Sequence, residues 1–440
     1  MRLSGWGRFP REDCRVSAPR DEDEARARVL AGSAIARGNG RAYGDSAASR
    51  ANTLDMRRLD HLLGFDAASG TVVAEAGVLL ADLIDAFLPR GWFPPVTPGT
   101  KHVTLGGMIA ADVHGKNHHR HGSFGNFVEW VDLMGPDGAV RRLSREREPE
   151  LFDWTLGGMG LTGVILRAAF RLVPVESGWI RQRTIAAPGL AAAMAAFERT
   201  EAATYSVAWI DCLARGEALG RSLLMLGEHA RREELPERAR RAPFSIPRRR
   251  ALAVPVDAPA ALLNRHSLRA FNALYYRRGA RAAGERLVDW DGYFYPLDRV
   301  RGWNRLYGRR GFAQLQCVLP LDAAGAGLRA LLAEASAAGA GSFLAVLKRL
   351  GAGRGGYSFA MPGYTLALDF PLSRRAPALL ERLDRIVIDH GGRFYLAKDA
   401  RMSAETLRRS DPRTGDFVAM RHHAGRARAF ASSQSARLGL

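Results

Sequence analysis

The histidines of this chain are concentrated in one short stretch. Five of the eleven lie between residues 102 and 121, in the text HVTLGGMIAADVHGKNHHRH. Histidine nitrogens are common metal ligands, so this density suggests a metal site. However, the stretch has no HExxH motif, and no cysteine or carboxylate pattern accompanies it at ligand spacing. We therefore predict no metal site, and the stretch needs another chemical explanation.

Glycines gather in three segments, at residues 36–46, 98–126 and 156–163. Glycine permits positive φ and lets a ligand approach the backbone amides, as a bound pyrophosphate requires. One such segment alone is an ordinary turn. The first is also not a Rossmann fingerprint, because polar residues and Leu54-Asp55-Met56 follow it instead of an apolar helix. Three segments, each beside a predicted strand, indicate a ligand that lies along a backbone groove.

Regular elements must position these segments. The pattern predicts a strand over 71–77, a helix over 78–88, and a hairpin of strands 128–134 and 139–143. From about residue 176 the sequence is rich in Ala, Leu and Arg, and its pattern predicts helices together with a strand at 206–210. A chain of 440 residues suggests about two domains. We interpret the Arg- and Pro-rich stretch 231–250 as a mobile surface loop, either solvated or docked on anionic lipid.

Composition narrows the functional classes. The chain is 47% apolar and 25% charged, as in globular proteins, and it has neither a signal-peptide pattern nor an apolar run of membrane length. Cys14, Cys212 and Cys317 are far apart, so we expect a reducing, cytoplasmic location without disulfides or zinc. The net charge of +19 leaves two explanations, a polyanionic partner and an Arg-rich genome. No helix-turn-helix, RRM or zinc pattern appears, so we predict no nucleic-acid partner.

Longer blocks resemble the FAD-binding family of vanillyl-alcohol-oxidase type, and within it the oxidases of decaprenylphosphoryl-ribose. The HGKNHH and YxAKDxR motifs are the specific ones, whereas the glycine segments alone indicate only FAD. The blocks are ARGNGRAYGD (36–45), PGTKHVTLGGMIAADVHGKNHHRHGSFGN (98–126), LGGMGLTGVI (156–165), WNRLYG (303–308), GFAQLQCVLP (311–320), GYTLALDFP (363–371) and GGRFYLAKDAR (391–401).

This resemblance implies an α+β fold with a two-lobed FAD-binding domain and an α+β substrate domain that contains an antiparallel sheet. We expect the FAD-binding domain at 1–175, the substrate domain at 176–390, and a C-terminal segment, 391–440, that returns to the first domain. Residues 36–46 contain no His and 98–126 no Cys for covalent attachment, so the FAD is predicted to be non-covalent. The implied cofactor-binding residues are Ala36, Arg37, Gly38, Asn39, Gly40, Arg41, Ala42, Tyr43, Gly44, Asp45, Ser46, Gly99, Thr104, Leu105, Gly106, Gly107, Ala111, Asp112, Val113, His114, Ile165 and Tyr395.

The resemblance also implies the chemistry. Lys398, His114 and Tyr43 are the predicted catalytic residues, and a lysine beside a flavin stabilises negative charge that develops on substrate oxygen. The predicted substrate-binding residues are Lys116, Gln314, Gln316, Lys348 and Lys398. A family member known as a drug target has a pocket cysteine where this chain has Ala367, so covalent trapping through that thiol is not expected.

The implied reaction is oxidation of the C2 hydroxyl of a polyprenylphosphoryl-β-D-ribofuranose to the 2-keto sugar. It is the first half of an epimerisation that forms an arabinose donor for cell-envelope polysaccharide. A separate NAD(P)H-dependent short-chain reductase is the expected partner for the second half. A polyprenyl substrate also gives the basic surface a use, in peripheral contact with an anionic bacterial membrane. A sugar-1,4-lactone or alditol oxidase of the same flavin family is the alternative.

Overall fold

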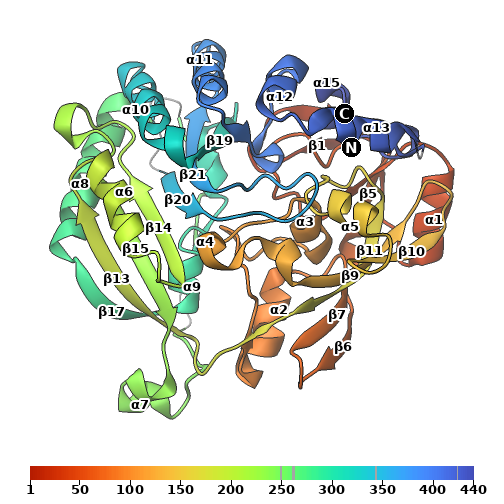
Figure 1. Cartoon of the computed structure of the whole chain (residues 1–440), viewed down its shortest axis with the longest axis horizontal. Coiled ribbons are helices and arrows are strands. Elements are labelled where there is room, and N and C mark those ends of the chain that lie inside the picture. The colour runs from red at the N-terminus through yellow and green to blue at the C-terminus, as the bar shows by residue number, and fades with distance from the viewer. Residues whose placement is uncertain (248–249, 260–262, 342–343, 424) are drawn as a thin grey trace.

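Two β-sheets organise the chain, one formed before residue 175 and the other after it (Figure 1). The computed structural model describes residues 1–247, 250–259, 263–341, 344–423 and 425–440. The mixture of helices with an eight-stranded antiparallel sheet confirms the predicted α+β class.

The first sheet has five antiparallel strands in the order β10-β9-β11-β7-β6. Helices α2 (Leu80–Phe87) and α3 (Leu105–Ala110) pack their apolar residues against it in one core. A smaller parallel sheet, β3-β5-β4, lies beside it with α1 (Glu22–Leu30). The strands are β3 (Val16–Ser17), β4 (Ile35–Arg37), β5 (Thr53–Asp55), β6 (Leu62–Asp66), β7 (Thr71–Glu75), β9 (Val128–Met134), β10 (Val140–Ser144) and β11 (Val164–Arg171).

The second sheet has eight antiparallel strands in the order β17-β13-β15-β14-β20-β21-β19-β22. One face packs on α6 (Leu190–Arg199), α10 (Leu321–Ala337) and α11 (Ala376–Asp389). Because side chains alternate along a strand, Leu315 and Cys317 enter this core while Gln314 and Gln316 point to the opposite face. The strands are β13 (Trp179–Ala187), β14 (Tyr205–Ile210), β15 (Ser222–His229), β17 (Gly284–Asp289), β19 (Phe312–Pro320), β20 (Ala345–Leu350), β21 (Gly363–Pro371) and β22 (Arg393–Phe394).

The end of the chain returns to its beginning, and both termini lie together in Figure 1. Ala34 forms a parallel bridge with Phe430, and the Arg437 guanidinium pairs with both Asp45 and Asp399 at 2.8 Å. The C-terminal helices are α12 (Ala404–Ser410), α13 (Thr414–His423), α14 (Arg426–Ala429) and α15 (Ser433–Leu438).

The long helix α8 and several short elements complete the fold. The remaining helices are α4 (His118–His121), α5 (Pro149–Thr155), α7 (Glu237–Arg240), α8 (Arg265–Arg281) and α9 (Trp290–Phe294). The remaining strands are β1 (Arg2–Ser4), β2 (Arg11–Asp13), β8 (Trp92–Phe93), β12 (Val173–Pro174), β16 (Leu252–Ala253) and β18 (Val300–Arg301). No helix in the described ranges is long and apolar enough to cross a membrane.

Most predicted elements form within two residues of their expected bounds. The strand expected at 71–77 is β7, the helix at 78–88 is α2, and the expected hairpin is β9–β10. The stretch 231–250 lies at the surface, where α7 projects from the body of the molecule (Figure 1). Residues 248 and 249 of that stretch lie outside the described residues, and its mobility stays a prediction.

Candidate active site

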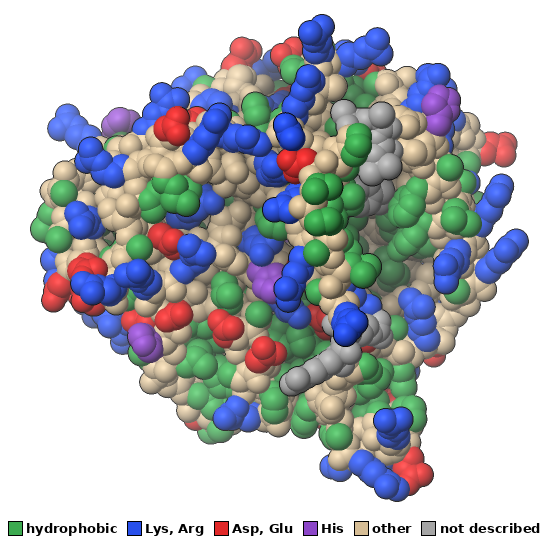
Figure 2. Space-filling view, turned by 180° about the vertical axis from the view of Figure 1, so that it is seen from behind, with side chains coloured by type: hydrophobic (Ala, Val, Ile, Leu, Met, Phe, Trp, Pro, Cys, Tyr) green, Lys and Arg blue, Asp and Glu red, His purple; other side chains and the backbone are tan. Residues whose placement is uncertain are grey.

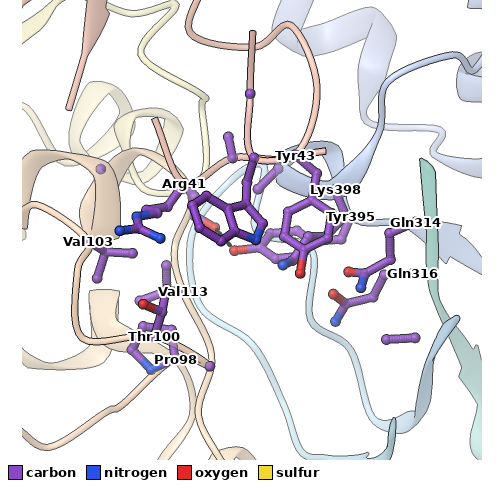
Figure 3. Close-up of a pocket in the computed structure, with 18 of the residues that line it drawn as sticks. Arg41, Tyr43, Pro98, Thr100, Val103, Val113, Gln314, Gln316, Tyr395 and Lys398 are labelled. Carbon is purple, nitrogen blue, oxygen red and sulfur yellow. Dashed lines mark hydrogen bonds between the residues drawn. The ribbon is translucent and has the colours of Figure 1, made fainter. Parts of the chain in front are cut away.

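A cavity of about 900 Å³ lies between the glycine segments and the open face of the eight-stranded sheet. Figure 3 shows Arg41, Thr100 and Val113 on one side, Gln314 and Gln316 on the other, and Tyr43, Tyr395 and Lys398 between them. The cavity is lined by these predicted residues: Ala36, Arg37, Gly38, Asn39, Gly40, Arg41, Ala42, Tyr43, Gly44, Ser46, Gly99, Thr104, Gly106, Gly107, Ala111, Val113, His114, Lys116, Ile165, Gln314, Gln316, Lys348, Tyr395 and Lys398.

Three residues predicted to bind cofactor do not line this cavity. Leu105 is fully buried in the core behind it. Asp45 forms an ion pair with Arg437, and Asp112 accepts hydrogen bonds from Ser123 and Ser358. Both carboxylates thus hold the loops in place and do not line the cavity. The sequence motif alone does not distinguish this supporting role from direct contact with the cofactor.

The glycine wall, residues 36–44 together with 98–107, presents backbone amides, with Arg37 and Arg41 as the cationic side chains that line the cavity there. Within the described part of the chain, no acceptor contacts the amides of residues 39–42, although these residues line the cavity. Gly40 has φ +63°, and a Cβ on Gly38 would approach Thr104 Oγ1 to 2.1 Å. Unpaired amides need an acceptor, and diphosphate oxygens supply one. This wall therefore fits the diphosphate of FAD.

The C-terminal segment closes the cavity beside the glycine wall. The Tyr43 amide donates to the Ala397 carbonyl at 2.9 Å, and the Tyr395 hydroxyl donates to the Ala111 carbonyl at 2.9 Å. The Lys398 Nζ then lies 3.5 Å from the centre of the Tyr43 ring, a cation–π contact. Segments far apart in sequence thus place the predicted catalytic pair, Lys398 and Tyr43, in direct contact.

Asp369 is the acidic group that faces Lys398. Its carboxylate accepts hydrogen bonds from the Gln314 amide and, at 3.2 Å, from the Tyr307 hydroxyl. Burial raises the pKa of Asp369 to about 6. Burial lowers the pKa of Lys398 to about 8, and the charge of Asp369 opposes that fall. At neutral pH both groups are mainly charged.

His114 joins two predicted substrate residues. Its Nδ1 lies 3.1 Å from the Lys348 Nζ, and its Nε2 lies 2.9 Å from the Gln316 amide nitrogen. Burial, followed by the charge of Lys348, places the pKa of His114 well below its usual value. His114 is therefore neutral at pH 7, so one of its ring nitrogens carries the proton and only the other can accept a hydrogen bond from Lys348 or Gln316.

Lys116 and Lys348 add further cationic groups to the same cavity. The Lys116 Nζ donates to the Tyr293 carbonyl and lies 4.1 Å from the centre of the Tyr293 ring. Burial, together with the charge of Lys348, lowers the pKa of Lys116 to about 7. Burial and the charge of Lys398 also lower the pKa of Lys348 to about 7. Cations that depress one another in this way are stabilised when an anion binds between them.

The sheet wall, formed by the cavity face of β19, β21, β20 and β14, changes from polar to apolar across the strands. Gln316 pairs with Ala367, Ala367 with Val346, and Val346 with Trp209. Beyond Trp209, the cavity is lined by Met225, Leu268, Phe271 and Tyr275. One end of the cavity can therefore hold polar and anionic groups, and the other can hold a hydrocarbon.

Sequence reasoning missed Asp369, Trp209 and the apolar end of the cavity. Asp369 is a single acidic residue in the apolar strand sequence GYTLALDFP, and this isolated charge is the signal by which it could have been predicted as a site residue. The histidines of residues 102–121 contact separate partners. The His118 Nδ1 accepts a hydrogen bond from the Gly351 amide, whereas the His119 Nε2 faces the Ala203 carbonyl. Within the described ranges, no three His, Cys, Asp or Glu side chains are grouped so that they could hold a metal ion.

Comparisons with known proteins agree with this geometry. Residues 16–144 match the FAD binding domain family. The decaprenylphosphoryl-beta-D-ribose oxidase of Mycolicibacterium smegmatis is 35% identical over 451 residues, covering 100% of this chain and 97% of that protein. Two relatives from Oryza sativa subsp. japonica match smaller parts. The L-galactono-1,4-lactone dehydrogenase 1 is 30% identical over 31% of this chain and 23% of its own length, and cytokinin dehydrogenase 2 is 32% identical over 33% and 28%.

Proposed function

Because the chain belongs to the decaprenylphosphoryl-β-D-ribose oxidase family of FAD-dependent oxidoreductases, we propose that it oxidises the C2 hydroxyl of a polyprenylphosphoryl-β-D-ribofuranose. The product is the 2-keto sugar. The observation that carries this proposal is the order of groups along the cavity: unpaired amides, then three lysines and two glutamines, then an apolar end. That order matches a flavin diphosphate, a phosphorylated sugar and a hydrocarbon chain.

Bound FAD supplies the hydride acceptor, and the protein supplies placement and charge. The amides of residues 39–42 hold the diphosphate, and Tyr395 closes the wall beside it. No His lies in residues 36–46 and no Cys in 98–126, so attachment is non-covalent. Precipitation of the protein with acid should therefore release all of the yellow flavin into the supernatant.

Lys398 carries the charge on which the oxidation depends. Loss of the hydroxyl proton leaves negative charge on the substrate oxygen, and the Lys398 ammonium stabilises that charge in a partly buried site. Asp369 keeps Lys398 protonated, while Tyr43 fixes the ammonium against its ring face. We assign Lys398 as a catalytic residue and Tyr43 and Asp369 as positioning residues.

Lys116 and Lys348 bind the phosphodiester of the substrate. Both lie between the glycine wall and the apolar end, and each has its pKa lowered by a neighbouring lysine. His114 lies against both Lys348 and Gln316 and positions them, and Gln316 contacts the sugar. The position of Ala367 beside Gln316 leaves room there without a thiol.

Two partners follow from the substrate. The 2-keto sugar needs a reductase with its own hydride donor to complete the epimerisation, and this chain has no Rossmann fingerprint to bind one. We therefore propose a separate NAD(P)H-dependent short-chain reductase. A polyprenyl chain also confines the substrate to a membrane, which the enzyme approaches peripherally.

A sugar-1,4-lactone or alditol oxidase is the alternative within the same flavin chemistry. The match to the lactone dehydrogenase covers only 31% of this chain, and a small polar substrate leaves Trp209, Phe271 and Tyr275 without a role.

Product analysis tests the choice. The purified enzyme is incubated with polyprenylphosphoryl ribose and a dye acceptor, and the product is trapped with borodeuteride. We expect the keto product to be two hydrogens lighter than the substrate, and its reduction to give ribo and arabino sugars that each carry one deuterium at C2. Oxidation of L-galactono-1,4-lactone, without oxidation of the lipid-linked sugar, would support the alternative.

A further inference from the structure

Helix α8 presents different faces to three different environments. Its residues Leu268 and Asn272 are buried where the helix packs on β13 and β15. Its residues Ser267, Leu268, Phe271 and Tyr275 line the apolar end of the cavity. A third face, centred on Leu274, is turned to solvent. The helix therefore lies at the rim of the cavity, where Phe271 and Tyr275 belong to both the cavity lining and the exposed surface.

The solvent face of α8 is apolar. Leu274 is 68% exposed, Phe271 44% and Tyr275 42%. Residues spaced by three and four lie on one side of a helix, so these side chains form a single stripe. In the described ranges, no other helix exposes more than one large hydrophobic side chain. Leu252 and Val256, each 69% exposed, precede α8 in the same stretch of chain.

Basic side chains flank this stripe. Arg277, Arg278 and Arg281 are exposed, and α8 itself contains no acidic residue. Among the residues that the structure describes, no carboxylate lies within 4.0 Å of these three guanidinium groups. Figure 2 shows hydrophobic side chains gathered in a hollow on the face behind Figure 1, with Lys and Arg side chains around it. Exposed arginines without acidic partners complement an anionic surface.

We propose that the Phe271–Leu274–Tyr275 stripe of α8 docks the enzyme on a lipid bilayer with anionic headgroups. The inference rests on the proposed function in one respect, because a lipid-linked substrate gives the docked cavity its purpose. An amphipathic helix with aromatic and aliphatic residues on one side and arginines beside them lies in the headgroup region of a bilayer. Phe271 and Tyr275 belong both to the stripe and to the cavity lining, so docking places the apolar end of the cavity at the membrane. A hydrocarbon chain then passes from bilayer to cavity without crossing water.

A fluorescent label measures docking directly at the stripe. The three native cysteines are buried, so a thiol introduced by Leu274→Cys is the accessible site for an environment-sensitive dye. On FAD-loaded protein, we expect dye emission to rise about threefold or more with phosphatidylglycerol-containing vesicles, as insertion into an apolar phase requires. The matched control is Leu30→Cys, on α1, where the leucine is 59% exposed. Its emission should stay unchanged, although the same net charge of +19 attracts both proteins to the vesicles.

A second pair of variants connects docking to turnover. We expect Leu274→Glu to slow oxidation of a long-chain substrate embedded in vesicles about tenfold, and Leu30→Glu to leave it unchanged. Both variants should oxidise a water-soluble short-chain analogue at the wild-type rate. Equal dye responses at positions 274 and 30, or no response at 274, would overturn the proposal. The dye measurement needs no substrate, so a failure of the proposed reaction is read separately from a failure of docking.

Discussion

The two walls of the cavity bind in different ways. The glycine wall presents the amides of residues 39–42 and φ-permissive turns, with Arg41 as a cationic side chain among them. The sheet wall presents Lys348, Gln314, Gln316 and Asp369 from neighbouring strands, with Lys398 close by. We propose that one wall binds a ligand through oriented backbone dipoles, and the other through charged side chains whose pKa values depend on each other.

This difference predicts which substitutions change which property. Changes in the glycine wall should alter cofactor affinity and leave the chemistry of the bound flavin unchanged. Changes in the sheet wall should alter rate, substrate affinity or pH dependence while flavin content stays constant. A variant that changes both flavin affinity and the kinetics of the bound flavin would show that the two walls do not act independently.

The largest effect is expected for Lys398→Met. Methionine retains the bulk but removes the charge that we propose to stabilise the substrate oxyanion, so kcat should fall on the order of 10²–10³-fold. The flavin content of the purified variant, measured by absorbance, should equal that of the wild type. Loss of flavin together with loss of rate would place Lys398 in cofactor binding instead.

Gly99→Val tests the opposite wall. A Cβ at Gly99 meets no heavy atom within 4 Å, so the added side chain projects into open cavity without disturbing the fold. We expect the Kd for FAD to rise roughly tenfold to a hundredfold, equivalent to about 1.4–2.8 kcal/mol. Titration of the apo-protein measures this, and Gly325→Val, also free of contacts within 4 Å, is the matched control. Unchanged FAD affinity would contradict the assignment of this wall.

Lys348→Met is expected to affect substrate affinity. Removal of one cation that we propose to face the phosphodiester should raise KM for the phosphorylated substrate about tenfold, the cost of a single lost charge-assisted contact. A neutral ribofuranoside of the same sugar serves as the control, and its kinetics should not respond. Equal losses with the neutral and the phosphorylated sugar would instead indicate a general packing defect.

Asp369→Asn should shift the pH profile. Lys398 loses its proton as pH rises through about 8, and its function as a cation is lost with it. The negative charge of Asp369 raises that pKa, so its removal lowers the pKa of Lys398 and moves the alkaline fall of kcat to lower pH. We expect a shift on the order of one pH unit, typical of one nearby charge. If the alkaline fall of kcat stays at the same pH, Asp369 does not raise the pKa of Lys398.

The smallest effect is expected for Ala367→Cys. Hydride transfer needs no thiol at this position, so kcat should stay within about twofold of wild type, as for a substitution that adds no strain. The variant should gain a cavity thiol that alkylating reagents modify, because the native Cys14, Cys212 and Cys317 are buried. Absence of labelling at position 367 would show that this part of the sheet wall is closed to ligands.

The difference between the two walls also explains which site residues could be predicted from the sequence. Gly38, Gly40 and Gly99 are local signals, since a turn near a ligand requires them wherever the chain runs. The partnership of Asp369 with Gln314 and Lys398 depends instead on strand register and on the return of the C-terminal segment, and no local pattern encodes either. Asp112 illustrates the limit from the other side: it stands in the quoted FAD motif but supports the loop from behind.

We propose that one cavity holds flavin against its glycine wall and a lipid-linked sugar against its sheet wall. Anaerobic titration of the yellow protein with polyprenylphosphoryl ribose tests this most directly, through flavin absorbance at about 450 nm. We expect stoichiometric bleaching in the wild type and much slower bleaching at equal flavin content in Lys398→Met. Flavin that is present but stays oxidised with this substrate would contradict the claim.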